Sequence, residues 1–183
     1  MRLLAWLALL TAAGLASCGS EDRQLGAAGD EGVLRFAMER LNGKPDRLSN
    51  YRGKAVLVVN TASECGFTPQ FKALERLWRE RRDEGLVVLG FPANDFAGQE
   101  PRSNSEIAKF CRANFGVSFP MFAKLRVTGD GAHPLFKALG QPDWNFNKYL
   151  LDRRGRLVEH WGATTEPDDP ELTARLAETL RAG

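Results

Sequence analysis

The segment that most restricts the fold is a strand, helix, strand succession between residues 55 and 91. Residues 55–59 (AVLVV) and 86–91 (LVVLGF) are short apolar runs, typical of strands that are covered on both faces. The residues between them predict an amphipathic helix from Pro69 to about Gly85, with apolar positions at spacings of three and four: Phe71, Leu74, Leu77 and Trp78. Strands joined in this way are parallel, so their carboxyl ends should carry the functional site.

A cysteine follows the first of these strands. Residues 60–70 form a polar loop that contains Cys65 and leads into the helix. Thr68 is predicted to cap this helix, and Pro69 is tolerated at its first position. Cys65 would then lie near the positive end of the helix dipole, which favours thiolate over thiol. We therefore predict that Cys65 is a reactive thiol, the alternative being an inert core cysteine.

The remaining elements complete an α/β fold. Alternating residues 34–38 and a turn at 42–43 predict an N-terminal β-hairpin, and residues 147–161 predict a second hairpin. Further helices are predicted to begin at residues 103–106 (SNSE, a capping box), at 133–134 and at 169–170. The expected architecture is a central mixed β-sheet flanked by helices on both faces.

Length and charge restrict the class of protein. The chain has 183 residues, of which 43% are hydrophobic and 26% charged, which fits one globular domain with its own core. The net charge is +2, and no basic run is interleaved with aromatic residues. We therefore expect no nucleic-acid partner.

The first 17 residues predict an export signal. One positive charge precedes an apolar run that is too short to span a bilayer comfortably. Residues 15–18 (LASC) resemble the bacterial lipoprotein cleavage box, in which the cysteine, here Cys18, is lipidated. Residues 18–32 then predict a flexible tether, and 33–183 the catalytic domain. The expected location is the cell envelope, on the periplasmic or outer surface, with the protein anchored to the membrane.

Two cysteines remain when Cys18 is assigned to lipidation. An exported protein can hold a stable disulfide between Cys65 and Cys111, which is one reading of this pair. The chain contains no Cys-x-x-Cys pair and only two histidines, so we expect neither a metal nor another cofactor. His133 precedes a proline, which favours a helix-capping or surface role over that of a catalytic base.

Three blocks together resemble the glutathione peroxidase family. They are residues 60–68 (NTASECGFT), 91–101 (FPANDFAGQEP) and 144–146 (WNF), in the order and roughly the spacing of the family. The resemblance spans about residues 33–182. It implies a thioredoxin-like fold and a bacterial, cysteine-type peroxidase, because Cys65 stands where some members have selenocysteine.

Carried over by position, the resemblance assigns four site residues. Cys65 is the peroxidatic thiol, and its partners are Gln99, Trp144 and Asn145. Attack of a thiolate on a peroxide develops negative charge on the leaving oxygen, and two amides and an indole N–H are neutral donors that can stabilise it. Taken singly, each partner is an ordinary loop amide or rim aromatic, and only their joint match favours the catalytic role.

Cys111 is the candidate resolving cysteine. Family members that accept electrons from thioredoxin carry a resolving cysteine in this region, although Cys111 is displaced by about one residue, which turns a helical side chain by about 100°. Its helix would have to unwind to form a disulfide with Cys65. The alternative is a buried helix cysteine that never leaves its apolar stripe.

Departures from the family restrict the remaining expectations. The short link from residue 136 to 144 leaves no room for the subunit-bridging loop of tetrameric members, which favours a monomer. It also removes positions that bind glutathione in some relatives, so a thioredoxin-like dithiol is the expected reductant of a hydroperoxide-reducing enzyme, with glutathione as the alternative. A thioredoxin-fold thiol-disulfide oxidoreductase and a non-catalytic binding lipoprotein are the competing functions.

Overall fold

The computed structural model describes residues 32–182. The predicted leader, Cys18 and the tether up to residue 31 lie outside the described residues, whereas Gly32 already belongs to the first 3-10 helix. Within residues 32–182, no helix is long and apolar enough to cross a membrane.

The elements follow one another in an α/β order. In chain order they are η1 (Gly32–Arg35), β1 (Ala37–Glu39), β2 (Pro45–Arg47), η2 (Leu48–Tyr51), β3 (Ala55–Thr61), α1 (Gln70–Arg81), η3 (Arg82–Glu84), β4 (Leu86–Pro92), α2 (Asn104–Phe115), α3 (Pro134–Leu139), β5 (Lys148–Leu151), β6 (Leu157–Trp161) and α4 (Pro170–Arg181).

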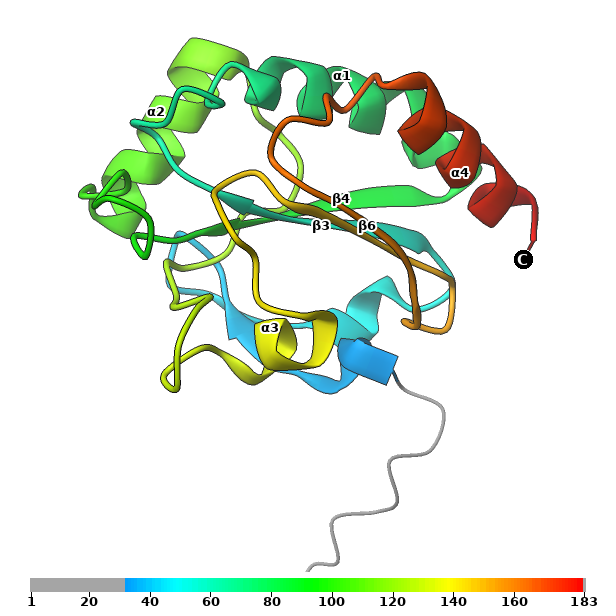
Figure 1. The fold of residues 1–183 in the computed structure, drawn as a ribbon, viewed down its shortest axis with the longest axis horizontal. Coiled ribbons are helices and arrows are strands. Elements are labelled where there is room, and N and C mark those ends of the chain that lie inside the picture. The colour runs from blue at the N-terminus through cyan, green and yellow to red at the C-terminus, as the bar shows by residue number, and fades with distance from the viewer. Residues whose placement is uncertain (1–31, 183) are drawn as a thin grey trace, which may run out of the picture.

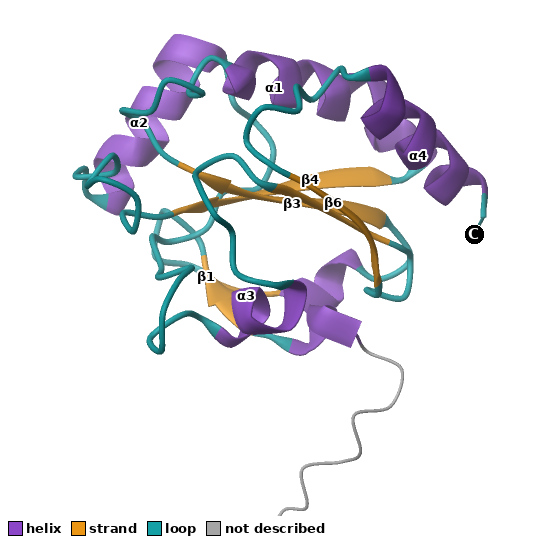
Figure 2. Cartoon of the chain, in the orientation of Figure 1, coloured by secondary structure: helices purple, strands orange, loops and turns teal. Residues whose placement is uncertain are grey.

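A four-stranded sheet forms the middle layer, with strands in the order β4-β3-β5-β6. Strands β3 and β4 are parallel, whereas β5 pairs antiparallel with both β3 and β6, so the predicted mixed sheet is confirmed. Helices α1, α2 and α4 cover one face, and α3 lies with the β1–β2 hairpin on the other (Figure 1). The strands form a continuous layer between these two groups (Figure 2).

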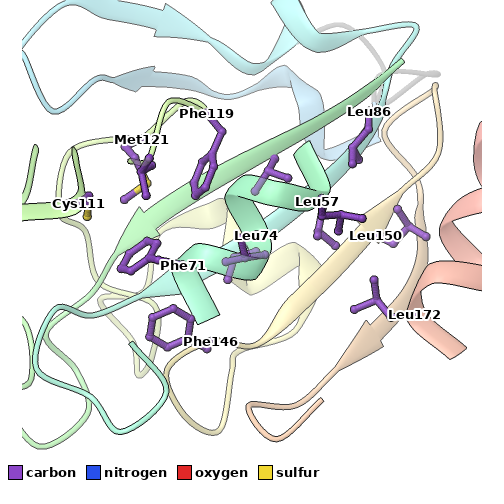
Figure 3. Packing of buried hydrophobic residues seen from close by; sticks show 14 of the residues in the cluster. Leu57, Phe71, Leu74, Leu86, Cys111, Phe119, Met121, Phe146, Leu150 and Leu172 are labelled. Carbon is purple, nitrogen blue, oxygen red and sulfur yellow. The ribbon is translucent and has the colours of Figure 1, made fainter. Parts of the chain in front are cut away.

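Strand β3 supplies both halves of the core, since all seven of its residues are buried. Leu57 and Val59 pack with the residues of α1, α2 and α4, while Val56 and Val58 pack with those of α3 and η2. Figure 3 shows the first of these clusters, in which Leu57 and Leu150 of the sheet face Leu172 and other apolar side chains. The alternation of faces along a strand thus explains why its sequence is apolar throughout.

The outer edge of β4 is covered by an irregular segment. Gly90 N donates to Pro120 O at 2.9 Å, and Gly90 O accepts from Phe122 N at 2.9 Å. A Cβ atom on Gly90 would lie 2.2 Å from Met121 Sδ, so a side chain at this position would require the flexible Met121 side chain to move.

The predicted N-terminal hairpin is present, but its first strand begins later than expected. The alternating pattern from Leu34 predicts a strand, whereas Leu34 is fully buried in η1 and β1 begins at Ala37. Val33 N donates to Gly155 O at 3.0 Å, so this segment docks against the β5–β6 turn instead of continuing the sheet. The physical reason is a tertiary contact that the local pattern does not contain.

Candidate active site

The loop between β3 and α1 is closed on itself around Cys65. Thr68 Oγ1 accepts from Cys65 N at 3.0 Å and donates to Ala62 O at 3.0 Å, and Thr68 N donates to Cys65 O at 3.0 Å. The Cys65 side chain is 8% exposed, and Phe67 N donates to its sulfur at 3.5 Å. The loop thus presents a backbone amide to the sulfur just ahead of α1, where negative charge is favoured.

The predicted helix cap at Thr68 is wrong. Helix α1 begins at Gln70, Pro69 is its N-cap, and no side chain caps the helix. The Thr68 hydroxyl instead bridges the cysteine loop to Ala62. A hydroxyl can serve only a few partners, and here a buried carbonyl and the Cys65 amide take it.

A hydrogen bond joins Gln99 and Asn145, two of the predicted partners that lie far apart in the sequence. Asn145 Nδ2 donates to Gln99 Oε1 at 3.0 Å, and Gln99 O accepts from Glu64 N, next to Cys65, at 3.0 Å. Since the Gln99 amide oxygen is engaged, its Nε2 hydrogens remain for a ligand. Asn145 is fully buried, and its Oδ1 has no hydrogen-bond partner among residues 32–182.

Trp144 is placed by its backbone more than by burial. Its side chain is 36% exposed and contacts the Phe96 ring, with ring centroids 5.5 Å apart. Its carbonyl oxygen accepts from Asn60 Nδ2 at 2.9 Å and from Asn147 Nδ2 at 3.0 Å. The structure therefore brings residues 144–145 beside the end of β3, and links residue 145 to the loop that ends at Gln99.

Asn60 is the main positioning residue that the sequence reasoning missed. Besides its bond to Trp144, its Oδ1 accepts from Asn147 N at 3.0 Å and its carbonyl accepts from Phe146 N at 2.7 Å. These bonds hold Phe146 at a φ of 65°, in the left-handed region that bulky residues rarely adopt. An asparagine directly after a buried strand is a signal, although its partners lie more than 80 residues away.

A charged cluster flanks the cysteine loop on the side of Gln99. Ser63 Oγ donates to the buried Glu100 Oε1 at 2.6 Å, and Arg102 Nη1 donates to Ser63 Oγ at 2.5 Å and to Glu64 Oε1 at 2.7 Å. Burial raises the pKa of the Glu100 carboxyl, against the lowering effects of Ser63, Arg102 and Lys124. The cluster ties residues 63–64 to the loop that carries Gln99.

Lys148 binds the segment 162–165, which also contacts the start of α1 after the cysteine loop. It is fully buried, and its Nζ donates to the carbonyl oxygens of Thr165 at 2.5 Å, Ala163 at 3.3 Å and Gly162 at 3.5 Å. Gln70, at the start of α1, donates to Ala163 O at 2.8 Å. Burial lowers the pKa of the Lys148 ammonium to about 8, with the charge of Glu166 acting in the opposite direction.

Cys111 lies in a different environment from Cys65. It is 2% exposed inside α2, on the apolar face that packs against Met121, and both thiols are free (Figure 3). Burial raises the pKa of its thiol to about 12, the Glu100 charge adds to this, and Arg102 opposes it. Its side chain lines a cavity of about 470 Å³ between α2 and the β1–β2 hairpin.

Two further polar residues, Asp95 and His133, have structural roles. Asp95 accepts hydrogen bonds from Val127 N and Thr128 N, both at 3.3 Å, so it anchors a neighbouring loop. His133 Nδ1 accepts from Leu135 N at 3.1 Å at the start of α3, which confirms the predicted helix-capping role. Among residues 32–182, no group of three or more His, Cys, Asp or Glu side chains is arranged to hold a metal ion.

Sequence comparison relates the chain to known peroxidases. The glutathione peroxidase family profile matches residues 33–140. A glutathione peroxidase from Lactococcus lactis is 47% identical over 145 residues, covering 74% of this chain and 92% of the relative. A glutathione peroxidase-like peroxiredoxin from Schizosaccharomyces pombe is 47% identical, covering 71% and 88%. A hydroperoxy fatty acid reductase from Synechocystis sp. is 42% identical, covering 81% and 95%.

Solved structures agree with the fold. The apo form of Trgpx superposes with a TM-score of 0.66 at 35% identity, over 82% of this chain and 96% of that one. A thioredoxin family thiol:disulfide interchange protein from Chlorobium tepidum has a TM-score of 0.56 at 17% identity, over 79% and 92%. The second likeness shows the fold alone, and together they confirm the predicted thioredoxin-like architecture.

Proposed function

The chain belongs to the glutathione peroxidase family, and we propose that it reduces hydrogen peroxide and organic or lipid hydroperoxides with Cys65 as the peroxidatic thiol. The observation that supports this most is the hydrogen bond between Asn145 and Gln99, which places two amides beside the loop of a buried cysteine. The cysteine loop, the loop that carries Gln99 and residues 144–145 meet at the end of β3. A catalytic role requires such a meeting, and unrelated loop amides would not be expected to show it.

The reaction follows from the chemistry of the four residues. The Cys65 thiolate attacks one peroxide oxygen, the O–O bond breaks, and an alkoxide or hydroxide leaves and takes a proton. Cys65 becomes a sulfenic acid, and the peroxide becomes an alcohol or water. Gln99 Nε2, the Trp144 indole N–H and the Asn145 amide would stabilise the developing oxyanion without changing their own charge.

A second thiol must return the sulfenic acid to the reduced state. We propose that Cys111 condenses with it to form a disulfide and release water, and that a thioredoxin-like dithiol then reduces the disulfide. The relative from Schizosaccharomyces pombe is named a peroxiredoxin, which supports a protein dithiol over glutathione as the reductant. Because Cys111 lies within α2, this step requires the last turns of that helix to open.

The proposed location restricts the substrate. Export, lipidation of Cys18 and anchoring in the cell envelope would bring a monomer close to membrane hydroperoxides. The relative from Synechocystis sp. is named for hydroperoxy fatty acids, which supports lipid hydroperoxides as substrates. Loss of membrane partition in Cys18→Ala would test the anchor separately from the enzymatic activity.

Peroxide consumption coupled to reduced thioredoxin, glutathione or a small dithiol tests the activity, with Cys65→Ser as the matched variant. We expect turnover in the wild type and its loss in the variant. Turnover that survives Cys65→Ser would overturn the assignment, and insulin reduction without peroxide turnover would favour the thiol-disulfide oxidoreductase. Mass spectrometry after one equivalent of peroxide should show a disulfide between Cys65 and Cys111.

A further inference from the structure

Asn147 follows Trp144 by three residues in the sequence. Its side chain is fully buried. Its Nδ2 donates to Asp143 Oδ1 at 3.0 Å and to Trp144 O at 3.0 Å, while its Oδ1 lies 2.7 Å from His160 Nε2. Its backbone N donates to Asn60 Oδ1 at 3.0 Å. All hydrogen-bonding atoms of this side chain are thus engaged, and one of its partners reaches the outer strand β6.

The partners determine which atom carries the hydrogen between Asn147 and His160. Both Nδ2 hydrogens of Asn147 point to oxygen atoms, so its Oδ1 must accept, and His160 Nε2 must donate. A reversed amide would place Oδ1 against the oxygens of Asp143 and Trp144. Asp143 and Trp144 therefore set the orientation of the amide, and His160 Nε2 supplies the donor that binds its oxygen and helps to hold it there.

The His160 ring is itself held in place. Residues Tyr149 and His160 are opposite one another in the β5–β6 pairing, and their rings stack with centroids 4.3 Å apart and an interplanar angle of 8°. Partial burial lowers the pKa of the His160 imidazole, against the raising effects of Asp143 and Glu159. A ring that carries a hydrogen on Nε2 fits the contact with Asn147 Oδ1.

Trp144 depends on this support because its side chain is 36% exposed and packing restrains it little. Its carbonyl is fixed by two amide donors, Asn60 Nδ2 and Asn147 Nδ2. A change in the Asn147 amide would release one of these donors. Because the indole belongs to the same residue, the direction of its N–H would then be less well defined.

We propose that His160 is a positioning residue for peroxide reduction: through Asn147 it fixes the backbone of Trp144 and so directs the indole N–H at the reacting oxygen. This inference rests on the proposed function and adds to it a residue that none of the three sequence blocks contains. It predicts that a donor at position 160 matters more than a ring.

Two variants separate the donor from the ring. His160→Phe keeps an aromatic ring to stack on Tyr149 and removes the donor, whereas His160→Gln removes the ring and restores a donor. We expect the second-order rate constant for oxidation of Cys65 by hydrogen peroxide, measured in a single turnover, to fall about tenfold in His160→Phe. His160→Gln should stay within about threefold of the wild type, as should the control Glu159→Gln on the same strand. Thermal unfolding of each variant confirms that it is folded.

The indole N–H resonance of Trp144 provides a readout that does not need activity. In a nitrogen-15 NMR spectrum, assigned with Trp144→Phe, we expect this resonance to shift or broaden in His160→Phe and to keep its position in His160→Gln. An unchanged resonance and rate in folded His160→Phe would overturn the inference. If wild-type Cys65 fails to react with peroxide, the proposed function fails, while the resonance still decides whether His160 positions Trp144.

Discussion

Cys65 and Cys111 are almost equally inaccessible, at 8% and 2% exposure, yet their surroundings differ in kind. Cys65 lies in a loop in which one backbone amide, Phe67 N, donates to its sulfur at 3.5 Å. Cys111 lies inside α2, where the backbone amides are used by the helix and the nearby carboxylate of Glu100 disfavours a thiolate. A thiol buried in an apolar helix face next to a carboxylate is kept in its protonated form, whereas a thiol of similar exposure in a loop can receive a backbone N–H.

The largest expected difference is in the reactivity of Cys111. With a pKa of about 12, its thiolate fraction at pH 8 should be about 1,000-fold below that of an ordinary thiol of pKa 9. Alkylation of Cys111 by iodoacetamide in the Cys65→Ser protein should be correspondingly slow, and it should recover in concentrated urea. Peptide mass spectrometry measures the rate of labelling in the folded and in the unfolded protein. Equal rates would show that the fold does not suppress the reactivity of Cys111.

The amides beside Cys65 should account for the next largest effect. Replacing Gln99 by leucine removes a proposed donor and also the acceptor of the Asn145 amide. We expect kcat/KM for hydrogen peroxide to fall about 100-fold or somewhat more, the usual effect of losing one oxyanion donor.

Gln99→Glu should be equally impaired, because an ionised carboxylate cannot donate, and Asn50→Ala in η2 is a control at an exposed amide. If the folded Gln99 variants have the same steady-state rates as the wild type, Gln99 is not one of the catalytic donors.

The buried ammonium of Lys148, which binds the segment that contacts the start of α1, should make the stability of the protein depend on pH. The pKa of this ammonium is about 8 in the folded protein, against 10.5 for an ordinary lysine, so the unfolded chain binds more protons between these two pH values. Stability should therefore rise with pH, by about 1.5 kcal/mol from pH 8 to 9.5 relative to Lys148→Met.

The measurement is urea unfolding at both pH values for each protein. Lys54→Met, at an exposed lysine, should leave the slope of the wild type unchanged. A difference between wild type and Lys148→Met that does not vary with pH would show that the ammonium is not buried as the structure indicates.

The smallest expected effect concerns Thr68. Thr68→Val removes the hydroxyl that joins Cys65 N to Ala62 O, at a cost of about 1 kcal/mol in the free energy of unfolding. Thr68→Ser retains the hydroxyl and should recover most of this loss. Equal stability of the valine and serine variants in denaturant unfolding would show that the bridge contributes nothing.

Local signals made much of the fold predictable. The capping box at Ser103 and the Asp169-Pro170 start of α4 are both present, because a cap is decided by residues within one helical turn. Thr68 looked like a third cap, but its hydroxyl serves Ala62 instead. The difference lies in a tertiary partner that no window around residue 68 contains.

Some residues of the candidate site could likewise be predicted from the sequence, and others could not. Cys65 could be selected from its place after a buried strand, and Gln99, Trp144 and Asn145 from a resemblance over three blocks. Asn60 was not selected, although it binds the segment 144–147 through three hydrogen bonds. Its importance arises from pairs of residues more than 80 positions apart, which a single sequence does not connect.

Gly90 has a consequence for the behaviour of the protein at high concentration. Its backbone N–H and carbonyl pair with Pro120 and Phe122, so residues 120–122 occupy the hydrogen-bonding edge of β4, the strand at one margin of the sheet. A second chain cannot add a strand at that margin without first displacing this segment, and strand addition is a common start of aggregation. A side chain at position 90 would have to displace the Met121 side chain, and if this loosened residues 120–122 the edge of β4 would become accessible, although the position takes no part in the chemistry.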